Sequence, residues 1–151
     1  MRIVKDILAS KAQAFNTVQT GTLVLQALTL LNSVNLSYLV VMDGNEYKGL
    51  FCERDYSRNV ILKGRSSDTT KVEEVMTTDL PVVSLTDSVE YCMNYMNTQK
   101  TRYLLAYDNN KFAGVITIHD LLRQVIANKE EVFDSGVANS LLDNEESGRI
   151  Y

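Results

Sequence analysis

Two aspartates stand in the same local pattern, each three residues after a small polar side chain. The first copy is Gly49-Leu-Phe-Cys52-Glu-Arg-Asp55, and the second is Gly114-Val-Ile-Thr117-Ile-His-Asp120. A hydroxyl at a strand end and a carboxylate in the first turn of the next helix face the same space and can hold a vicinal diol. The free N–H groups at a helix start suit a phosphate. The pattern therefore fits a ribose phosphate.

The same spacing also has a structural explanation, because Ser, Thr and Asp commonly cap the start of a helix. Thr117 and Asp120 would then cap the start of the last helix, and Cys52 and Asp55 would cap its counterpart in the first half. Both interpretations stay open. Cys52 is a weaker donor than a hydroxyl, so the second copy is better equipped. A redox switch at Cys52 is the alternative to an inert buried thiol.

A dense basic cluster follows the first copy. Arg54 and Arg58 lie one helical turn apart, and Lys63 and Arg65 come shortly after. These cations would form charge-assisted hydrogen bonds with phosphate if they faced a cleft, or they form a solvated helix face. Arg102, beside the second hairpin, has the same two interpretations.

Nucleophilic and metal-dependent catalysis are not expected. His119 is the sole histidine, so no metal cluster is predicted. A Cys52–His119 dyad lacks an orienting third group, and the repeat described next places each opposite an unrelated residue. We predict that the protein is not an enzyme and has no catalytic residues.

The elements that position these residues occur twice. With a shift of 65 residues, seven of the 25 positions in 34–58 are identical. An internal repeat of this kind decides the architecture. We predict an α/β (α+β) fold with two β-α-β-β-α repeats related by a pseudo-twofold axis, each preceded by a short helix.

Apolar periodicity and turn residues give the approximate bounds of these elements. The lead-in helices are expected near 4–8 and 72–76, and a Ser- and Thr-rich linker at 65–71. The remaining predicted elements are extended segments 16–18 and 81–84, long helices after Thr22 and after Thr86 or Asp87 as N-cap, strands 38–42, 47–51, 103–107 and 112–117, and last helices 54–63 and 119–129. Gly49 and Gly114, inside strands, predict a bulge or a close approach.

Composition narrows the setting. The 151 residues carry a net charge of −4. Residues 129–151 hold six acidic and two basic residues, so 1–128 balance at 13 each, which argues against nucleic acid. We find no apolar run of the roughly 18 residues that span a bilayer and no signal peptide. Two cysteines fit a reducing compartment, so we predict a cytoplasmic protein that does not bind membranes.

The duplicated motif, the hairpins before it and the Val-x-Asp-Ile-Leu helix together closely resemble a tandem CBS-domain pair, or Bateman module, of the stand-alone bacterial type. The resemblance covers about residues 1–128: a first repeat at 1–65, a second at 66–128, and an acidic tail at 129–151. It implies a regulatory, energy-sensing homodimer that binds AMP, ADP, ATP, NAD or S-adenosylmethionine in clefts between the repeats. No obligatory cofactor is implied, and a regulated protein partner is expected.

The resemblance also nominates binding residues. In the second half they are Thr117 and Asp120, with Pro81, Val82, Val83, Arg102, Tyr103 and Leu104 around the base. In the first half they are Cys52 and Asp55, with Thr17, Val18 and Tyr38. The alternative to a sensor is a ligand-free dimerisation scaffold that acts through its tail.

Overall fold

The computed structural model describes residues 2–11, 16–34, 36–127 and 141, which fall into two compact units. One unit, called here the Asp55 unit, comprises residues 15–79. The other, the Asp120 unit, comprises residues 1–14 and 80–151. Each unit therefore contains one copy of the aspartate motif.

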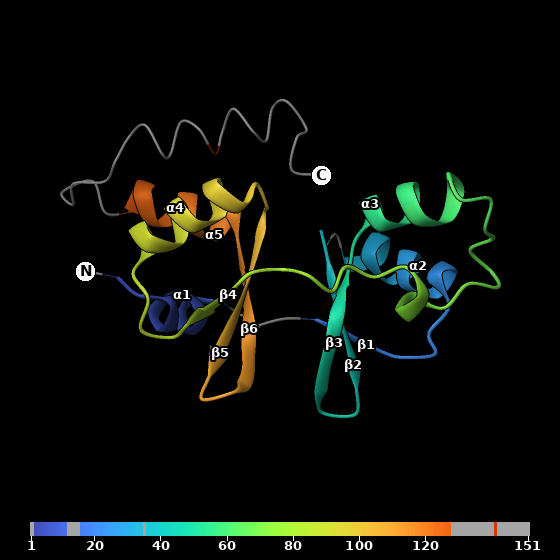
Figure 1. Cartoon of the computed structure of the whole chain (residues 1–151), viewed down its shortest axis with the longest axis horizontal. Helices are drawn as coiled ribbons and strands as arrows, with labels where there is room; N and C mark the ends of the chain where they lie inside the picture. The colour runs from blue at the N-terminus through green and yellow to red at the C-terminus, as the bar shows by residue number, and fades with distance from the viewer. Residues whose placement is uncertain (1, 12–15, 35, 128–140, 142–151) are drawn as a thin grey trace. The chain divides into compact units, whose positions relative to one another are not determined.

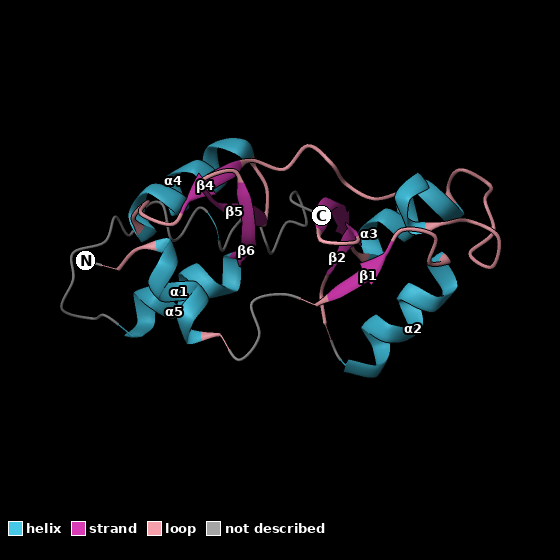
Figure 2. Cartoon of the chain, turned by 90° about the horizontal axis from the view of Figure 1, so that it is seen from below, coloured by secondary structure: helices cyan, strands magenta, loops and turns pink. Residues whose placement is uncertain are grey.

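The Asp55 unit is built on three strands, with its helices beside them (Figure 2). Its elements are β1 (Thr17–Gln19), α2 (Val24–Val34), β2 (Leu39–Asp43), β3 (Glu46–Phe51), α3 (Glu53–Tyr56), the π-helix η1 (Ser57–Ile61) and the 3-10 helix η2 (Val72–Glu74). Buried residues of α2, β2 and β3 form one apolar cluster, in which Ala27, Leu39 and Phe51 are fully buried. The apolar face of α2 therefore covers the sheet.

The Asp120 unit repeats this plan (Figure 1). Its elements are α1 (Val4–Ser10), β4 (Val82–Ser84), α4 (Val89–Gln99), β5 (Tyr103–Asp108), β6 (Lys111–Thr117) and α5 (Ile118–Ala127). Helix α4 contacts β5 and α5, while α1 and α5 contact β6. Its core includes Met93, Leu104 and Leu121, and also Leu141, the described residue of the tail.

The two sheets have the same topology and the same irregularity. Strand order is β1-β2-β3 in one and β4-β5-β6 in the other, with a parallel pair followed by an antiparallel hairpin. The register of each hairpin shifts directly after Val41 pairs with Gly49, or Ala106 with Gly114. The predicted mixed α/β repeats and the bulges at the two glycines are therefore confirmed.

The lead-in helix of each repeat packs in the unit that contains the other repeat's motif. Helix α1 places Val4 and Ile7 in the core of the Asp120 unit, and the segment at η2 places Val72 and Val75 in that of the Asp55 unit. The compact units consequently divide after residues 14 and 79. The repeat boundaries at 65 and 128 describe the duplication of the sequence and stay a prediction.

Two local details differ from the sequence-based expectation. The N-cap of α4 is Ser88, whose hydroxyl accepts the Tyr91 N–H at 3.0 Å. The prediction of Thr86 or Asp87 as this N-cap is wrong. The Asp87 carboxylate instead accepts the Ser84 N–H at 2.8 Å and stabilises the preceding turn. The predicted helix 54–63 changes from α3 to the π-helix η1 at Ser57.

The predicted linker at 65–71 is bonded to the start of α2. The carbonyls of Thr70 and Ser67 accept the N–H groups of Val24 and Leu25, at 2.8 and 2.9 Å. The first N–H groups of a helix lack partners within it, so these carbonyls cap α2. The segment is therefore a structural part of the Asp55 unit.

Candidate functional site

The second motif forms a reciprocal cap at the junction of β6 and α5. The Thr117 N–H donates to Oδ2 of Asp120 at 2.9 Å, and the Asp120 N–H donates to the Thr117 hydroxyl oxygen at 3.1 Å. This is the arrangement of a capping box, in which two helix-end N–H groups are satisfied together. The structural interpretation of the motif is therefore correct, although a cap does not exclude a ligand.

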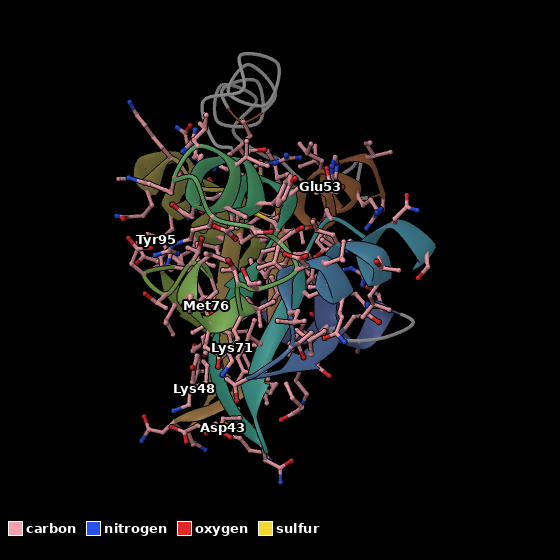
Figure 3. The ribbon with its side chains drawn as sticks, turned by 90° about the vertical axis from the view of Figure 1, so that its right-hand side faces the viewer. Asp43, Lys48, Glu53, Lys71, Met76 and Tyr95 are labelled. Atoms are coloured by element: carbon pink, nitrogen blue, oxygen red, sulfur yellow. The ribbon has the colours of Figure 1, made fainter. Side chains whose placement is uncertain are left out.

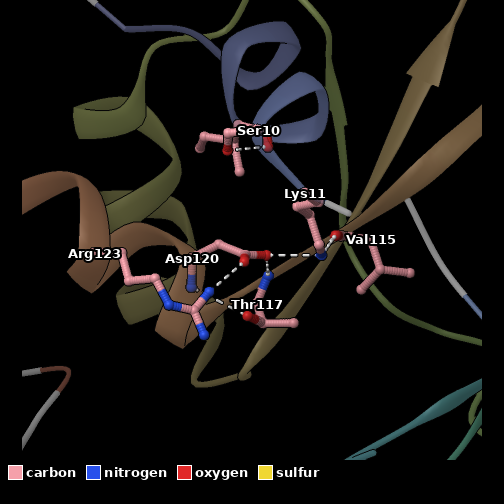
Figure 4. A network of polar contacts seen from close by, with 7 residues as sticks. Ser10, Lys11, Val115, Thr117, Asp120 and Arg123 are labelled. Atoms are coloured by element: carbon pink, nitrogen blue, oxygen red, sulfur yellow. Dashed lines mark hydrogen bonds and ion pairs between the residues drawn. The ribbon is translucent and has the colours of Figure 1, made fainter. Parts of the chain in front are cut away.

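Two cations also hold the Asp120 carboxylate (Figure 4). The Lys11 ammonium, from the residue after α1, donates to Oδ2 at 3.0 Å and to the Val115 carbonyl at 3.0 Å. Arg123, one turn along α5, donates to Oδ1 at 3.2 Å. Asp120 is 4% exposed and Lys11 17%, whereas Arg123 is 72% exposed. A buried carboxylate needs such partners, and Lys11 is the more important because the exposed Arg123 pair is weak.

The first motif surrounds its carboxylate with uncharged donors. Asp55 Oδ2 accepts the Cys52 N–H at 2.9 Å and the Cys52 thiol at 3.4 Å, and Oδ1 accepts the Thr77 hydroxyl at 2.8 Å. Burial raises the pKa of the Asp55 carboxyl, since these hydrogen bonds offset only part of the desolvation. The two copies therefore share a backbone arrangement and differ in electrostatics.

The Cys52 thiol is not activated. Burial, followed by the Asp55 charge, raises the pKa of Cys52 to about 11. Redox-active cysteines have lowered pKa values that favour the thiolate. The structure therefore favours the inert thiol over the redox switch.

Thr77 reaches Asp55 because the segment after η2 pairs with β3. Leu50 and Thr77 exchange two backbone hydrogen bonds, of 2.9 and 2.8 Å. A Cβ atom at Gly49 would lie 2.6 Å from Sδ of Met76 and 2.9 Å from the Thr77 carbonyl oxygen. Met76 is labelled in Figure 3. Only glycine lets this segment approach β3 so closely, as the glycine in the strand predicted.

The residues predicted to surround the base are divided between surface and core. Tyr103 is half-buried, Val82 is 51% exposed, and Val83 and Leu104 are buried in the core of the Asp120 unit. Pro81 is half-buried, and its carbonyl accepts the Leu105 N–H at 2.9 Å. Val82 pairs with Leu105, so these segments are neighbours. Val83 and Leu104 are core residues and do not present side chains to a ligand.

Arg102 directly precedes β5 and lies beside the strand–helix junction of the second motif. Its side chain is 6% exposed, and its guanidinium is 3.5 Å from Nε2 of His119. Its carbonyl accepts the N–H of Ile118, the first residue of α5, at 3.0 Å. A buried guanidinium therefore belongs to the surroundings of the Asp120 motif.

In the Asp55 unit, the corresponding strand residues are Thr17, Val18 and Tyr38. Thr17 is exposed, Val18 packs against the apolar cluster, and Tyr38 is buried. Thr17 pairs with Val40, two residues beyond Tyr38. Thr17 and Val18 thus lie on β1, and Tyr38 directly precedes the adjacent strand β2.

The basic cluster does not act as one group. Arg54 is half-buried. Burial raises the pKa of the Asp55 carboxyl, and the Arg54 charge is the smallest of the effects that oppose this rise. Arg58 and Lys63 are exposed, and Arg65 donates to the Glu74 carbonyl at 3.3 Å. For the outer three residues the structure favours the solvated interpretation.

Three residues at the motifs were missed from the sequence. Arg123 aligns with Arg58 in the repeat, which could have signalled it. Lys11 and Thr77 had no such signal, because they reach their aspartates across 109 and 22 residues of sequence. Neither position belongs to the local pattern.

The described residues contain no group of three or more His, Cys, Asp or Glu that could hold a metal ion. Among the described helices, none has the length and apolarity needed to span a bilayer. The acidic tail, apart from Leu141, lies outside the described residues.

The protein is a duplicated α/β domain. Each copy has a three-stranded sheet with one parallel and one antiparallel pair, and an aspartate that caps the helix after the last strand. A sequence model of the CBS domain matches residues 72–127. A putative signal-transduction protein with CBS domains from Burkholderia ambifaria has a similar solved structure. It is 33% identical, with a TM-score of 0.76, and the match covers 88% of this chain and all of that one.

Two further relatives are similar. The mitochondrial CBS domain-containing protein CBSX3 of Arabidopsis thaliana is 27% identical in an alignment of 137 residues, which covers 85% of this chain and 66% of that protein. A solved structure of CBSX2 in complex with AMP is 25% identical, with a TM-score of 0.70, over 85% of this chain and 99% of that one. The chain therefore belongs to the CBS-domain family of regulatory modules, and its two repeats form a CBS pair.

Proposed function

We propose that this protein is a non-catalytic regulatory module that binds an adenosine-containing ligand at the Thr117–Asp120 motif. The observation that carries the proposal is the relationship to CBSX2, whose solved structure contains AMP. That relative matches 85% of this chain at 25% identity. We further propose that the module acts as a homodimer on a separate protein partner in the cytoplasm.

The Asp120 carboxylate keeps one acceptor position that a ribose diol can use. A carboxylate has about four acceptor positions, and three are used within the described part of the chain, by Thr117, Lys11 and Arg123. One ribose hydroxyl takes the fourth. The second displaces Arg123, whose exposed pair contributes little. The Thr117 oxygen accepts the Asp120 N–H, so the hydroxyl can still donate its proton to the ligand.

We propose no catalytic role for either motif. The raised pKa of Cys52, about 11, keeps it protonated at neutral pH. The motif aspartates hold helix N-termini and hydrogen-bond donors. Such groups bind and orient a ligand.

A thermal-shift panel with AMP, ATP, NAD and S-adenosylmethionine tests the proposal. A ligand at 100 times its Kd adds about 2.7 kcal/mol to the free energy of unfolding, which raises Tm by several degrees for a chain of this size. We expect at least one ligand to do so. Asp120→Asn keeps the size of the side chain but removes its charge and one acceptor, so the shift is lost.

Asp87→Asn is the matched control, since Asp87 also bonds a local N–H in the same unit. We expect this variant to keep the shift. No shift with any of the four ligands, or an undiminished shift in Asp120→Asn, contradicts the proposal.

A ligand-free scaffold is the second candidate, because the capping boxes are complete without a ligand. It predicts that native mass spectrometry of the purified protein finds dimers without nucleotide. It also predicts partner binding that disappears when residues 129–151 are removed.

A further inference from the structure

The charges around the two motif aspartates differ although the aspartates themselves are equivalent. Lys11 and Arg123 each form an ion pair with the Asp120 carboxylate, at 3.0 and 3.2 Å. Two cations therefore hold this one carboxylate. All three groups belong to the same compact unit.

The corresponding partners of Asp55 are uncharged. Thr77 takes the part of Lys11, and Ser37 aligns with Arg102. Arg58, which aligns with Arg123, is exposed. The hydrogen bonds of Asp55 described above therefore all come from uncharged groups.

Lys11 is the cation that sets this difference at the carboxylate itself. Its ammonium is held by two acceptors, the Asp120 carboxylate and the Val115 carbonyl, each at 3.0 Å (Figure 4). An ammonium has three donors, and these two bonds are the ones it makes within the described part of the chain. The side chain is 17% exposed, so the third N–H is within reach of a bound molecule.

We infer that Lys11 is a specificity-determining residue that makes the Asp120 motif select phosphate-bearing adenosine ligands over uncharged ones. The inference rests on the proposed function and adds the ligand class and the residue that chooses it. A carboxylate that binds the ribose repels a phosphate attached to the same sugar, so the site needs a cation beside the carboxylate. Lys11 supplies it as a compact point charge, the form in which lysine binds phosphate.

The ratio of two affinities is the measurement, because both ligands share the ribose and the base. Titration calorimetry on the full chain compares AMP with adenosine for wild type, Lys11→Met, Lys11→Arg and Lys5→Met. Lys5 is the matched control, since it lies on α1, the helix directly before Lys11, and is exposed. Circular dichroism melts establish that each variant is folded at the titration temperature.

We expect wild type to prefer AMP by about tenfold or more, the low end of a charge-assisted hydrogen bond. Lys11→Met reduces the preference to near unity, whereas Lys11→Arg and Lys5→Met retain most of it. Adenosine has no phosphate for Lys11 to bind, so we expect Lys11→Met to bind adenosine as wild type does.

Four results overturn the inference. Equal binding of AMP and adenosine by wild type refutes it while the proposed function stands. An AMP preference that survives in Lys11→Met, or one that Lys5→Met loses equally, also refutes it. If wild type binds neither ligand nor any other of the panel, the proposed function fails as well.

Discussion

At the scale of single residues, equal spacing in sequence produces equal caps but unequal electrostatics. The interval of three between Thr117 and Asp120, or Cys52 and Asp55, is local, so the capping geometry could be predicted from the sequence. The partners Lys11 and Thr77 could not, because they reach the carboxylates through tertiary packing. The charge of each site is thus decided by residues outside the motif.

The uncharged partners of Asp55 lead to a pH-dependent stability. Burial raises the pKa of this carboxyl in the folded state, so the folded chain holds the proton more tightly than the unfolded chain. The stability that this group contributes is present below the ordinary Asp value of about 3.9 and is lost as pH rises through the folded value. We expect Asp55→Asn to gain Tm relative to wild type as pH increases from about 4 to 7.

Thermal melts across this pH range measure the difference between the two proteins. Asp43→Asn is the reference, because Asp43 is exposed near the tip of the β2–β3 hairpin (Figure 3). A constant difference between Asp55→Asn and wild type, or one that declines with pH, would show that burial does not dominate at Asp55.

At the scale of elements, the bulged hairpin is arranged to accept a neighbouring segment. The register shift directly follows the Val41–Gly49 pair, and the Leu50–Thr77 pairing lies next to it. The glycine could be predicted to mark a bulge or a close approach. Its neighbour, the segment of Met76 and Thr77, could not be named, since nothing local to the strand identifies it.

Gly49→Ala tests how tightly this contact is packed. The added methyl meets the flexible Met76 side chain and also the Thr77 carbonyl, which is fixed by its bond to the Leu50 N–H. Overpacking of this kind costs about 1–3 kcal/mol of unfolding free energy, measured by urea denaturation. We expect Met76→Ala to rescue Gly49→Ala only in part, because the carbonyl remains.

The neighbouring Lys48→Ala is the control, since it removes only a surface pair with Glu46 and costs little. Full rescue by Met76→Ala would mean that the side chain alone creates the constraint. An unchanged free energy in Gly49→Ala would mean that the segment does not approach β3 this closely.

At the scale of the whole molecule, the duplication correctly predicted the same β-α-β-β-α order of elements in both halves. It did not predict that the lead-in helices pack with the opposite repeats. Val4 and Ile7 have the same apolar spacing as Val72 and Val75, and such periodicity tells which face is buried but not against which body. The π-helix η1 likewise has no sequence signal that we recognise, since Gly64 marked only the end of the helix.

Because each lead-in helix packs with the opposite repeat, the fragments 15–79 and 1–65 should differ in stability although both have 65 residues. Fragment 15–79 matches a compact unit and keeps Val72 and Val75 in the core, together with the Ser67 and Thr70 carbonyls that cap α2. Fragment 1–65 matches the sequence repeat and loses all four. Domains of about 60 residues are marginal, so the loss decides whether one folds. We expect a cooperative melt by circular dichroism only for 15–79, and the reverse result would mean that the repeat is the folding unit.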